Sequence, residues 1–116
     1  MTVSELISSL EDYLYEDKKG RYHNYLYISD EDNYTDITID SVYYRCGEVV
    51  LQSNETDTPR WSLIIPYIIH CLKFFNGNTE VCVQVSDEDL DWEYLDTIDT
   101  YTDGDGDFTI SCSCRE

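Results

Sequence analysis

The carboxylates of two identical tetrapeptides are the side chains of this sequence best placed to do chemistry. Ser29-Asp30-Glu31-Asp32 recurs letter for letter as Ser86-Asp87-Glu88-Asp89, and each copy directly follows a run of alternating apolar residues. Grouped carboxylates bind cations, work as acid–base pairs, or present negative charge to a basic partner. Acid–base catalysis needs one distinguished pair, and the abundance of acidic residues singles out none. We therefore expect a binding surface and not an enzyme, with no catalytic residues.

Further acidic residues follow each tetrapeptide on stretches that are predicted to be strands. Residues two apart lie on one face of a strand at a separation of about 6.5–7 Å, which is of the order of the spacing between phosphates. The sequence thus predicts two rows of partner-binding carboxylates, with Trp92 and Tyr34 as aromatic anchors. The rows comprise Asp30, Glu31, Asp32, Asp36 and Asp40 in the first copy, and Asp87, Glu88, Asp89, Asp91, Glu93, Asp96 and Asp99 in the second.

The net charge favours a basic partner. The 116 residues include 25 Asp and Glu against 7 Lys and Arg, which gives a formal charge of −18. Such a charge rules against direct binding of nucleic acid or anionic membrane, whereas it attracts a surface lined with Lys and Arg. No Lys or Arg occurs from Phe74 to Cys114, so the negative charge is concentrated in one part of the chain. The alternative is an acidic surface that serves only solubility, as in a halophile.

Metal sites have weaker support in the sequence. The segment Asp103-Gly104-Asp105-Gly106-Asp107 resembles the start of an EF-hand loop, which also requires Gly at the sixth position and Glu at the twelfth. Those positions hold Phe108 and Cys114, so a hairpin turn is expected there, and weak binding of divalent cations stays open. Five cysteines without paired spacing do not predict zinc. We expect neither a metal nor a cofactor.

The elements that carry these residues are predicted to form two copies of one unit within a single α+β domain, 1–116. Leu6-Ile7 aligns with Leu63-Ile64 at an offset of 57 residues, and the segment from Gly47 aligns with that from Gly106 at an offset of 59. Each copy is predicted to be a helix followed by three strands, over 2–53 and 59–114, joined by a polar linker at 54–58. A unit of about 55 residues is marginal alone, so we expect one antiparallel sheet, or two, with one helix per copy packed on it.

Local patterns predict where the helices and strands lie. Apolar residues at helical spacing and a Thr2–Glu5 capping box predict a helix over Thr2–Leu14. An apolar run predicts a second helix over Trp61–Phe75, kinked or restarted at Pro66. Alternation predicts strands at 22–28, 36–44, 48–52, 80–85, 94–101 and 107–112. Ile37, Ile39 and Tyr43 should point inward in the second of these strands, and Asp107, Thr109 and Ser111 outward in the last.

The opening Thr2-Val-Ser-Glu-Leu-Ile-x-x-Leu10, followed by a strand ending in Ser29-Asp30, resembles short phage-encoded proteins that begin with such a helix and continue as a β-meander. In size, acidity and α+β character the chain also resembles phage-borne anti-CRISPR proteins and other DNA-mimic inhibitors. This resemblance implies a basic nucleic-acid-binding partner in the bacterial cytoplasm, such as a CRISPR effector or another defence nuclease. No signal peptide or membrane-spanning run is present to suggest another location.

A second class of function stays open. The chain would then be a phage or mobile-element accessory protein that mediates protein–protein assembly, a homodimer included, with its charge serving solubility. Substitutions of Tyr, Trp and Phe would then impair function, whereas substitutions of acidic residues would not.

Overall fold

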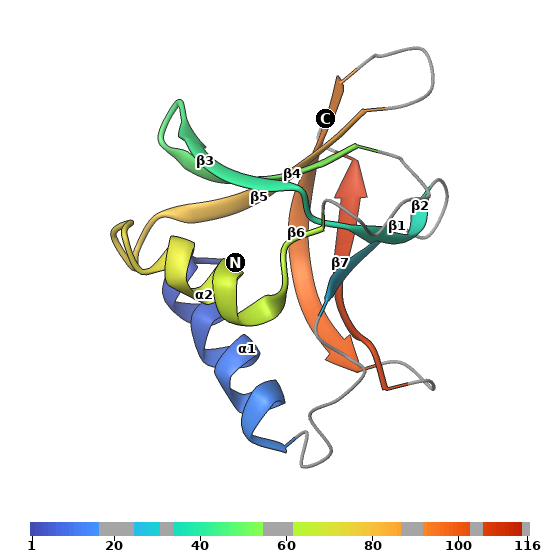
Figure 1. Cartoon of the computed structure of the whole chain (residues 1–116). Coiled ribbons are helices and arrows are strands. Elements are labelled where there is room, and N and C mark those ends of the chain that lie inside the picture. Colours follow the sequence, from blue (N-terminus) through green and yellow to red (C-terminus); the bar gives the residue numbers. More distant parts are fainter. Residues whose placement is uncertain (17–24, 31–33, 55–61, 87–91, 103–105, 115–116) are drawn as a thin grey trace.

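The computed structural model describes residues 1–16, 25–30, 34–54, 62–86, 92–102 and 106–114. Within these ranges the chain forms two helices and a seven-stranded curled sheet, which confirms the predicted α+β class. Figure 1 shows the two helices together on one side of the sheet. The elements are α1 (Val3–Glu16), β1 (Leu26–Asp30), β2 (Tyr34–Thr38), β3 (Ser41–Arg45), β4 (Glu48–Asn54), α2 (Ile65–Leu72), β5 (Glu80–Ser86), β6 (Trp92–Thr102) and β7 (Phe108–Cys114).

The sheet is mixed, so the prediction of a purely antiparallel arrangement is wrong. The strand order is β2-β1-β7-β6-β5-β4-β3. Pairs of strands joined by short connections are antiparallel, as expected for hairpins, namely β1–β2, β3–β4, β5–β6 and β6–β7. However, β1 pairs in parallel with β7, and β4 pairs in parallel with β5. Parallel neighbours need a long crossover, which α2 supplies between β4 and β5, and alternation within a strand carries no information about such distant partners.

The predicted strand over 36–44 is two strands at opposite edges of the sheet. β2 pairs with β1 and β3 pairs with β4, and only Ile39 and Asp40 separate them. The three residue steps from Thr38 to Ser41 span at most about 11 Å, so the sheet must curl until its two edges come close together. Hydrogen bonds hold the edges together there: Ser53 Oγ on β4 donates to the Thr38 carbonyl, and Asp40 N donates to Gln52 O at 2.8 Å.

One hydrophobic core fills the space between the helices and the inner face of the sheet. It includes Ile37 and Ile39, as predicted from the alternation around them. One other prediction of side-chain direction is wrong. Tyr43 points to the other face, where its hydroxyl bonds Gln84. Thr109 alternates with the core residues Phe108 and Ile110, as predicted, and is nevertheless buried.

Both ends of the helical prediction for α1 can be checked in the structure. Thr2 N donates to Glu5 Oε1 at 3.2 Å and Glu5 N donates to Thr2 Oγ1 at 3.3 Å, which confirms the capping box. The hydrogen bonds from Thr2 lower the pKa of Glu5. The helix continues to Glu16, two residues beyond the predicted end.

The second helix begins later than predicted. α2 starts at Ile65 with Pro66 in its first turn, where the missing N–H of proline costs nothing. The helix therefore begins at Ile65, next to Pro66, and is neither kinked nor restarted there, and it ends at Leu72. Residues 62–64 are not helical, because they are used for pairing: Leu63 N donates to Ile39 O at 2.7 Å, and Ile64 bridges Tyr25.

The β3–β4 hairpin provides a test of local strain. Cys46 and Gly47 have φ values of 51° and 84°, so this two-residue turn has the type I′ geometry that favours Asn-Gly. Replacing Cys46 with Asn is expected to raise the free energy of unfolding by about 0.5–1 kcal/mol, measured by urea denaturation, since Asn tolerates positive φ. Cys46→Ser removes the thiol without this relief and should have little effect. An unchanged or lower stability of Cys46→Asn would contradict the assignment of strain.

Candidate functional site

The structure describes part of the predicted acidic surface. Six of its residues lie outside the described ranges, namely Glu31, Asp32, Asp87, Glu88, Asp89 and Asp91. Along the described backbone, Asp30 is the last residue of β1, Asp36 lies within β2 and Trp92 is the first residue of β6. The remaining members are Asp40 between β2 and β3, and Glu93, Asp96 and Asp99 on β6.

Strand direction brings the two acidic tetrapeptides to the same end of the sheet. β1 is parallel to β7, whereas β6 is antiparallel to both β7 and β5. β1 and β5 therefore run in the same direction. Asp30 is the last residue of β1 and Ser86 is the last residue of β5, so the described beginnings of both tetrapeptides lie at the same end of the sheet.

The register of β7 also places the backbones of Asp30 and Asp96 on either side of the same strand. Cys112 on β7 is opposite Asp30 on one side and opposite Thr97 on the other, and the adjacent Ser113 is opposite Asp96. Asp30 and Asp96 thus flank β7 at about two strand spacings, roughly 10 Å between backbones. Sequence reasoning grouped these two residues in separate rows.

β6 displays acidic and apolar side chains together. Leu95 and Thr97 are buried, whereas Asp96 is exposed on the opposite face. A bulge between Thr97 and Asp99 shifts the register, which allows Asp99 to be exposed as well although it is three positions further on. The Asp99 carboxylate accepts a hydrogen bond from Thr100 N at 2.8 Å, and Ile98 between the two acids is 60% exposed.

The first predicted row is not continuous. Asp36 belongs to β2 and Asp40 lies beyond its end, at the point where the chain passes to the other edge of the sheet. Asp40 is half-buried, and so is Glu93 in the second row. The even spacing of carboxylates expected along a single strand is therefore wrong for Asp36 and Asp40.

A polar network that sequence reasoning missed crosses the outer face of β3, β4, β5 and β6. Gln84 Oε1 accepts hydrogen bonds from Tyr43 OH and from Gln52 Nε2, the latter at 3.1 Å. Gln84 Nε2 donates to Tyr94 OH at 3.3 Å, and Ser41 Oγ donates to Gln52 Oε1 at 2.9 Å. Burial raises the pKa of Tyr43. The period-two spacing of Ser41, Tyr43 and Arg45 was the only signal in the sequence.

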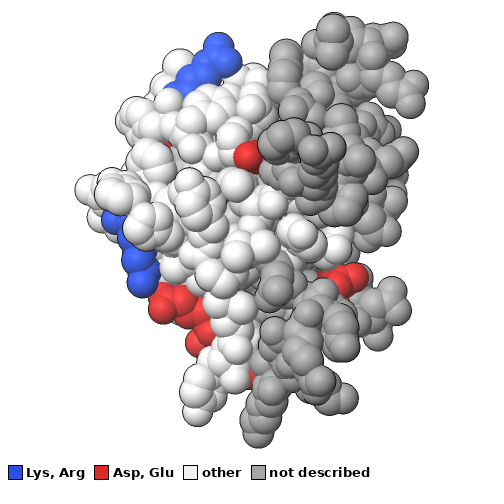
Figure 2. All heavy atoms as spheres, viewed as in Figure 1, with Lys and Arg blue, Asp and Glu red and all other residues white. Residues whose placement is uncertain are grey.

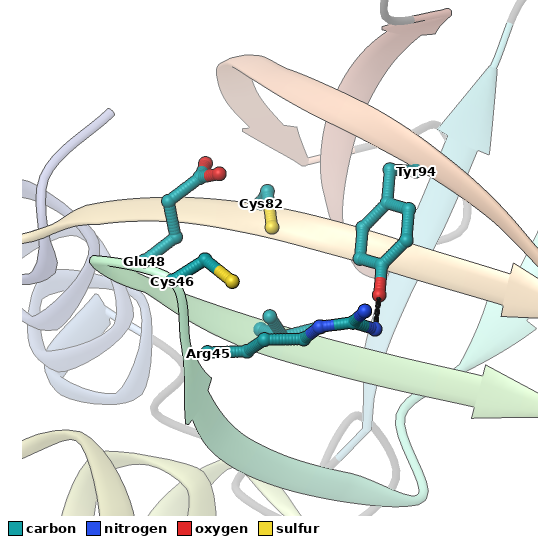
Figure 3. Close-up of a pocket in the computed structure, with 6 residues that line it drawn as sticks. Arg45, Cys46, Glu48, Cys82 and Tyr94 are labelled. Carbon is teal, nitrogen blue, oxygen red and sulfur yellow. Dashed lines mark hydrogen bonds between the residues drawn. The ribbon is translucent and has the colours of Figure 1, made fainter.

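The network borders a shallow pocket of about 210 Å³. Figure 3 shows the guanidinium of Arg45 beside Tyr94, to whose hydroxyl it donates a hydrogen bond. The Arg45 guanidinium also lies 5.6 Å from the centre of the Tyr94 ring, and its Coulomb interaction with Tyr94 raises the pKa of Arg45. The pocket is lined by Arg45, Cys46, Glu48, Val50, Cys82 and Tyr94.

The described lining of this pocket contains no nucleophile paired with a histidine base. Its one arginine is already engaged by Tyr94, and the exposed Cys46 thiol has no histidine among the lining residues to activate it. Across the described ranges, no group of three or more His, Cys, Asp and Glu side chains is arranged to hold a metal ion. The Asp103–Asp107 loop lies partly outside these ranges.

Comparisons with known proteins assign neither a family nor a function to this chain. In the part of the chain that the structure describes, no helix is long and apolar enough to cross a membrane. No protein-family model matches the chain, and neither a curated protein nor a solved structure shows significant similarity to it.

Proposed function

We propose that this protein is an acidic inhibitor that binds a basic nucleic-acid-handling protein and blocks its DNA or RNA site by mimicking the nucleic acid. The observation that carries the proposal is the shared direction of β1 and β5, which starts both acidic tetrapeptides from the same end of the sheet. Because the protein has a formal charge of −18, we expect a basic partner to bind at this end of the sheet. Inhibition of this kind needs no catalytic residue, and it would take place in the cytoplasm of a bacterial host.

The proposal includes the duplication of the αβββ unit. Supporting it, each half contributes a helix and then a strand that pairs in parallel with the last strand of the other half: β1 with β7, and β5 with β4. In the second half, β6 pairs with both β5 and β7. In the first half two strands take the corresponding place, since β2 pairs with β1 and β3 pairs with β4. Two such copies related by a pseudo-two-fold axis would present two symmetric acidic segments, as duplex DNA presents two strands.

The salt dependence of binding tests the inhibitor proposal. Purified CRISPR effectors and other defence nucleases would be titrated with the protein at rising salt, by calorimetry and by inhibition of cleavage. Affinity for a true target should fall at least tenfold between about 0.05 and 0.2 M salt, because the contacts are mainly electrostatic. Binding that is absent, or that does not change with salt, would remove the proposal.

Charge reversal localises the contact. Changing Asp87, Glu88 and Asp89 together to Lys should weaken target binding at least a hundredfold without unfolding the protein. The matched control reverses Glu11, Asp12 and Glu16 on α1, which alters the net charge by the same amount. An equal loss of affinity in both variants would show that total charge, and not the acidic end of the sheet, governs binding.

The second candidate function, protein–protein assembly, is favoured by a different observation. Several large apolar side chains are exposed away from the acidic end, including Tyr67 and Phe74. An accessory protein would bind through these residues, and neutralising its carboxylates would leave assembly intact.

A further inference from the structure

The outward side of α2 and its immediate flanks carry a continuous stripe of apolar and aromatic side chains, Ile64, Tyr67, His70 and Phe74, here called the α2 stripe. The rings touch in sequence: Tyr67 and His70 have centroids 6.3 Å apart, and His70 and Phe74 have centroids 5.3 Å apart. Tyr67 is 51% exposed and Phe74 is 77% exposed. Beside the stripe, the exposed Tyr44 of β3 stacks on Phe75 at 6.2 Å.

The α2 stripe lies in the least acidic part of the chain. No Asp or Glu occurs from residue 58 to residue 79, although the whole protein has 25. Lys73 is the one Lys or Arg of α2 and its described flanks, 62–79. In the view of Figure 2, the described surface is mostly uncharged, with only small areas of Asp, Glu, Lys and Arg. A contact made by this segment therefore sets no carboxylate of its own residues against the partner copy, which limits the electrostatic repulsion that two copies must overcome.

The size of the patch fits a modest interface. Aromatic side chains bury about 150–250 Å² each, so the exposed parts of Ile64, Tyr67, Phe74 and Tyr44 amount to something on the order of 400 Å². A standard interface buries about 800 Å² on each partner, with a polar rim around an apolar centre. The stripe is thus large enough for the apolar centre of such an interface. Contiguous apolar patches of this size on a protein surface are often functional, whereas single exposed apolar residues are not.

The charge of the possible partners also indicates which of them binds at the α2 stripe. The stripe itself has no carboxylate to pair with the charges of a basic protein, and burying unpaired charge is costly. Nucleic acid and anionic membrane are repelled by the net charge. A second copy of the chain supplies the same aromatic stripe, whose own residues carry no carboxylate to desolvate.

We propose that the α2 stripe is the interface of a homodimer. A closed pair of identical faces requires a two-fold axis, and an axis near His70, in the middle of the stripe, sets Tyr67 of each copy against Phe74 of the other. This inference is independent of the inhibitor proposal. Together the two would place two acidic ends on one dimer.

Analytical ultracentrifugation of the intact chain tests the proposal, at concentrations from about 1 to 300 μM, which cover weak to moderate dimers. A monomer–dimer equilibrium is expected. Its association constant should rise severalfold from 0.1 to 1 M salt, because the Debye length falls from about 10 to 3 Å and the repulsion between two charges of −18 is screened. Target binding should respond to salt in the opposite direction, so either proposal can fail without the other.

Variants with matched charge locate the interface. Phe74→Asp should weaken association at least tenfold, and Tyr67→Ser should weaken it severalfold without adding charge. Ile98→Asp makes a comparable change at an exposed apolar residue of β6 and should leave dimerisation unchanged. Circular dichroism should show native folding in all three, since these side chains are exposed.

Three results would overturn the proposal: a monomer at the highest concentration in 1 M salt, equal effects of Phe74→Asp and Ile98→Asp, or open-ended assembly in place of a dimer. Retained inhibition by a monomeric Phe74→Asp variant would leave the inhibitor proposal intact.

Discussion

Replacing Ile39 with alanine is expected to lower the free energy of unfolding by about 3–4 kcal/mol, the cost of truncating a fully buried isoleucine. Ile39 is completely buried and lies in the two-residue link between β2 and β3. Its carbonyl accepts the hydrogen bond of Leu63 N, which alanine would preserve. The change therefore removes packing at the point where the two edges of the curled sheet meet, without altering the backbone contacts.

The chain offers a matched control for this experiment. Ile98→Ala makes the same chemical change at a side chain that is 60% exposed, and it should alter the stability by less than about 0.5 kcal/mol. Ile39→Val should fall between the two, at about 1 kcal/mol. Urea denaturation monitored by tryptophan fluorescence gives all three values. A loss below about 1.5 kcal/mol for Ile39→Ala would mean that the link is not tightly packed and that the sheet is open there.

The split between β2 and β3 shows where sequence reasoning about the fold ends. Alternation identified Ile37 and Ile39 as inward-facing, and both are buried. The same pattern continues through the break, so a single strand over 36–44 was the natural prediction. What divides the strand is the choice of partner, β1 on one side and β4 on the other, and partners distant in sequence leave no mark on local periodicity.

In the candidate site, too, local sequence patterns predicted the exposure of single residues but not the pairing of distant strands. The exposure of Asp96 and Asp99 agrees with their predicted outward positions. Their relation to Asp30 across β7 follows from a parallel pairing that no short motif encodes. Gln84 was missed for another reason: a polar residue within a strand is usually taken as solvent-facing, yet here it is 5% exposed and is hydrogen-bonded to Tyr43 and Tyr94.

The second helix is less buried than its apolar composition predicts. An apolar run over 61–75 predicted a helix more buried than the first one, and its inner residues Ile65, Ile68 and Leu72 are buried. The remaining apolar residues have no protein layer above them among the described residues, because both helices lie on the same side of a single sheet. The surplus hydrophobicity of this segment is what motivates the dimer proposal.

Gln84 is the residue whose loss should most disturb the outer face of the sheet. Gln84→Met keeps the length of the side chain but removes both its acceptor and its donor, which leaves Tyr43 OH and Gln52 Nε2 without their partner oxygen. We expect the free energy of unfolding to fall by about 2–3 kcal/mol, because losing one member of a buried network costs more than losing one exposed hydrogen bond.

A double-mutant cycle separates this network from simple packing. Tyr43→Phe alone should cost about 1 kcal/mol, and the double variant Tyr43→Phe, Gln84→Met should be less destabilised than the sum of the two by about 1 kcal/mol, since the second change finds the shared hydrogen bond already lost. Additive losses would show that Tyr43 and Gln84 act independently. The pocket gives a second readout, because Gln84 also positions Tyr94, which holds Arg45. Removing Gln84 should therefore loosen Arg45 and increase the reaction rate of the neighbouring Cys46 thiol with a bulky reagent, whereas Gln52→Met, which leaves Tyr94 bonded, should not.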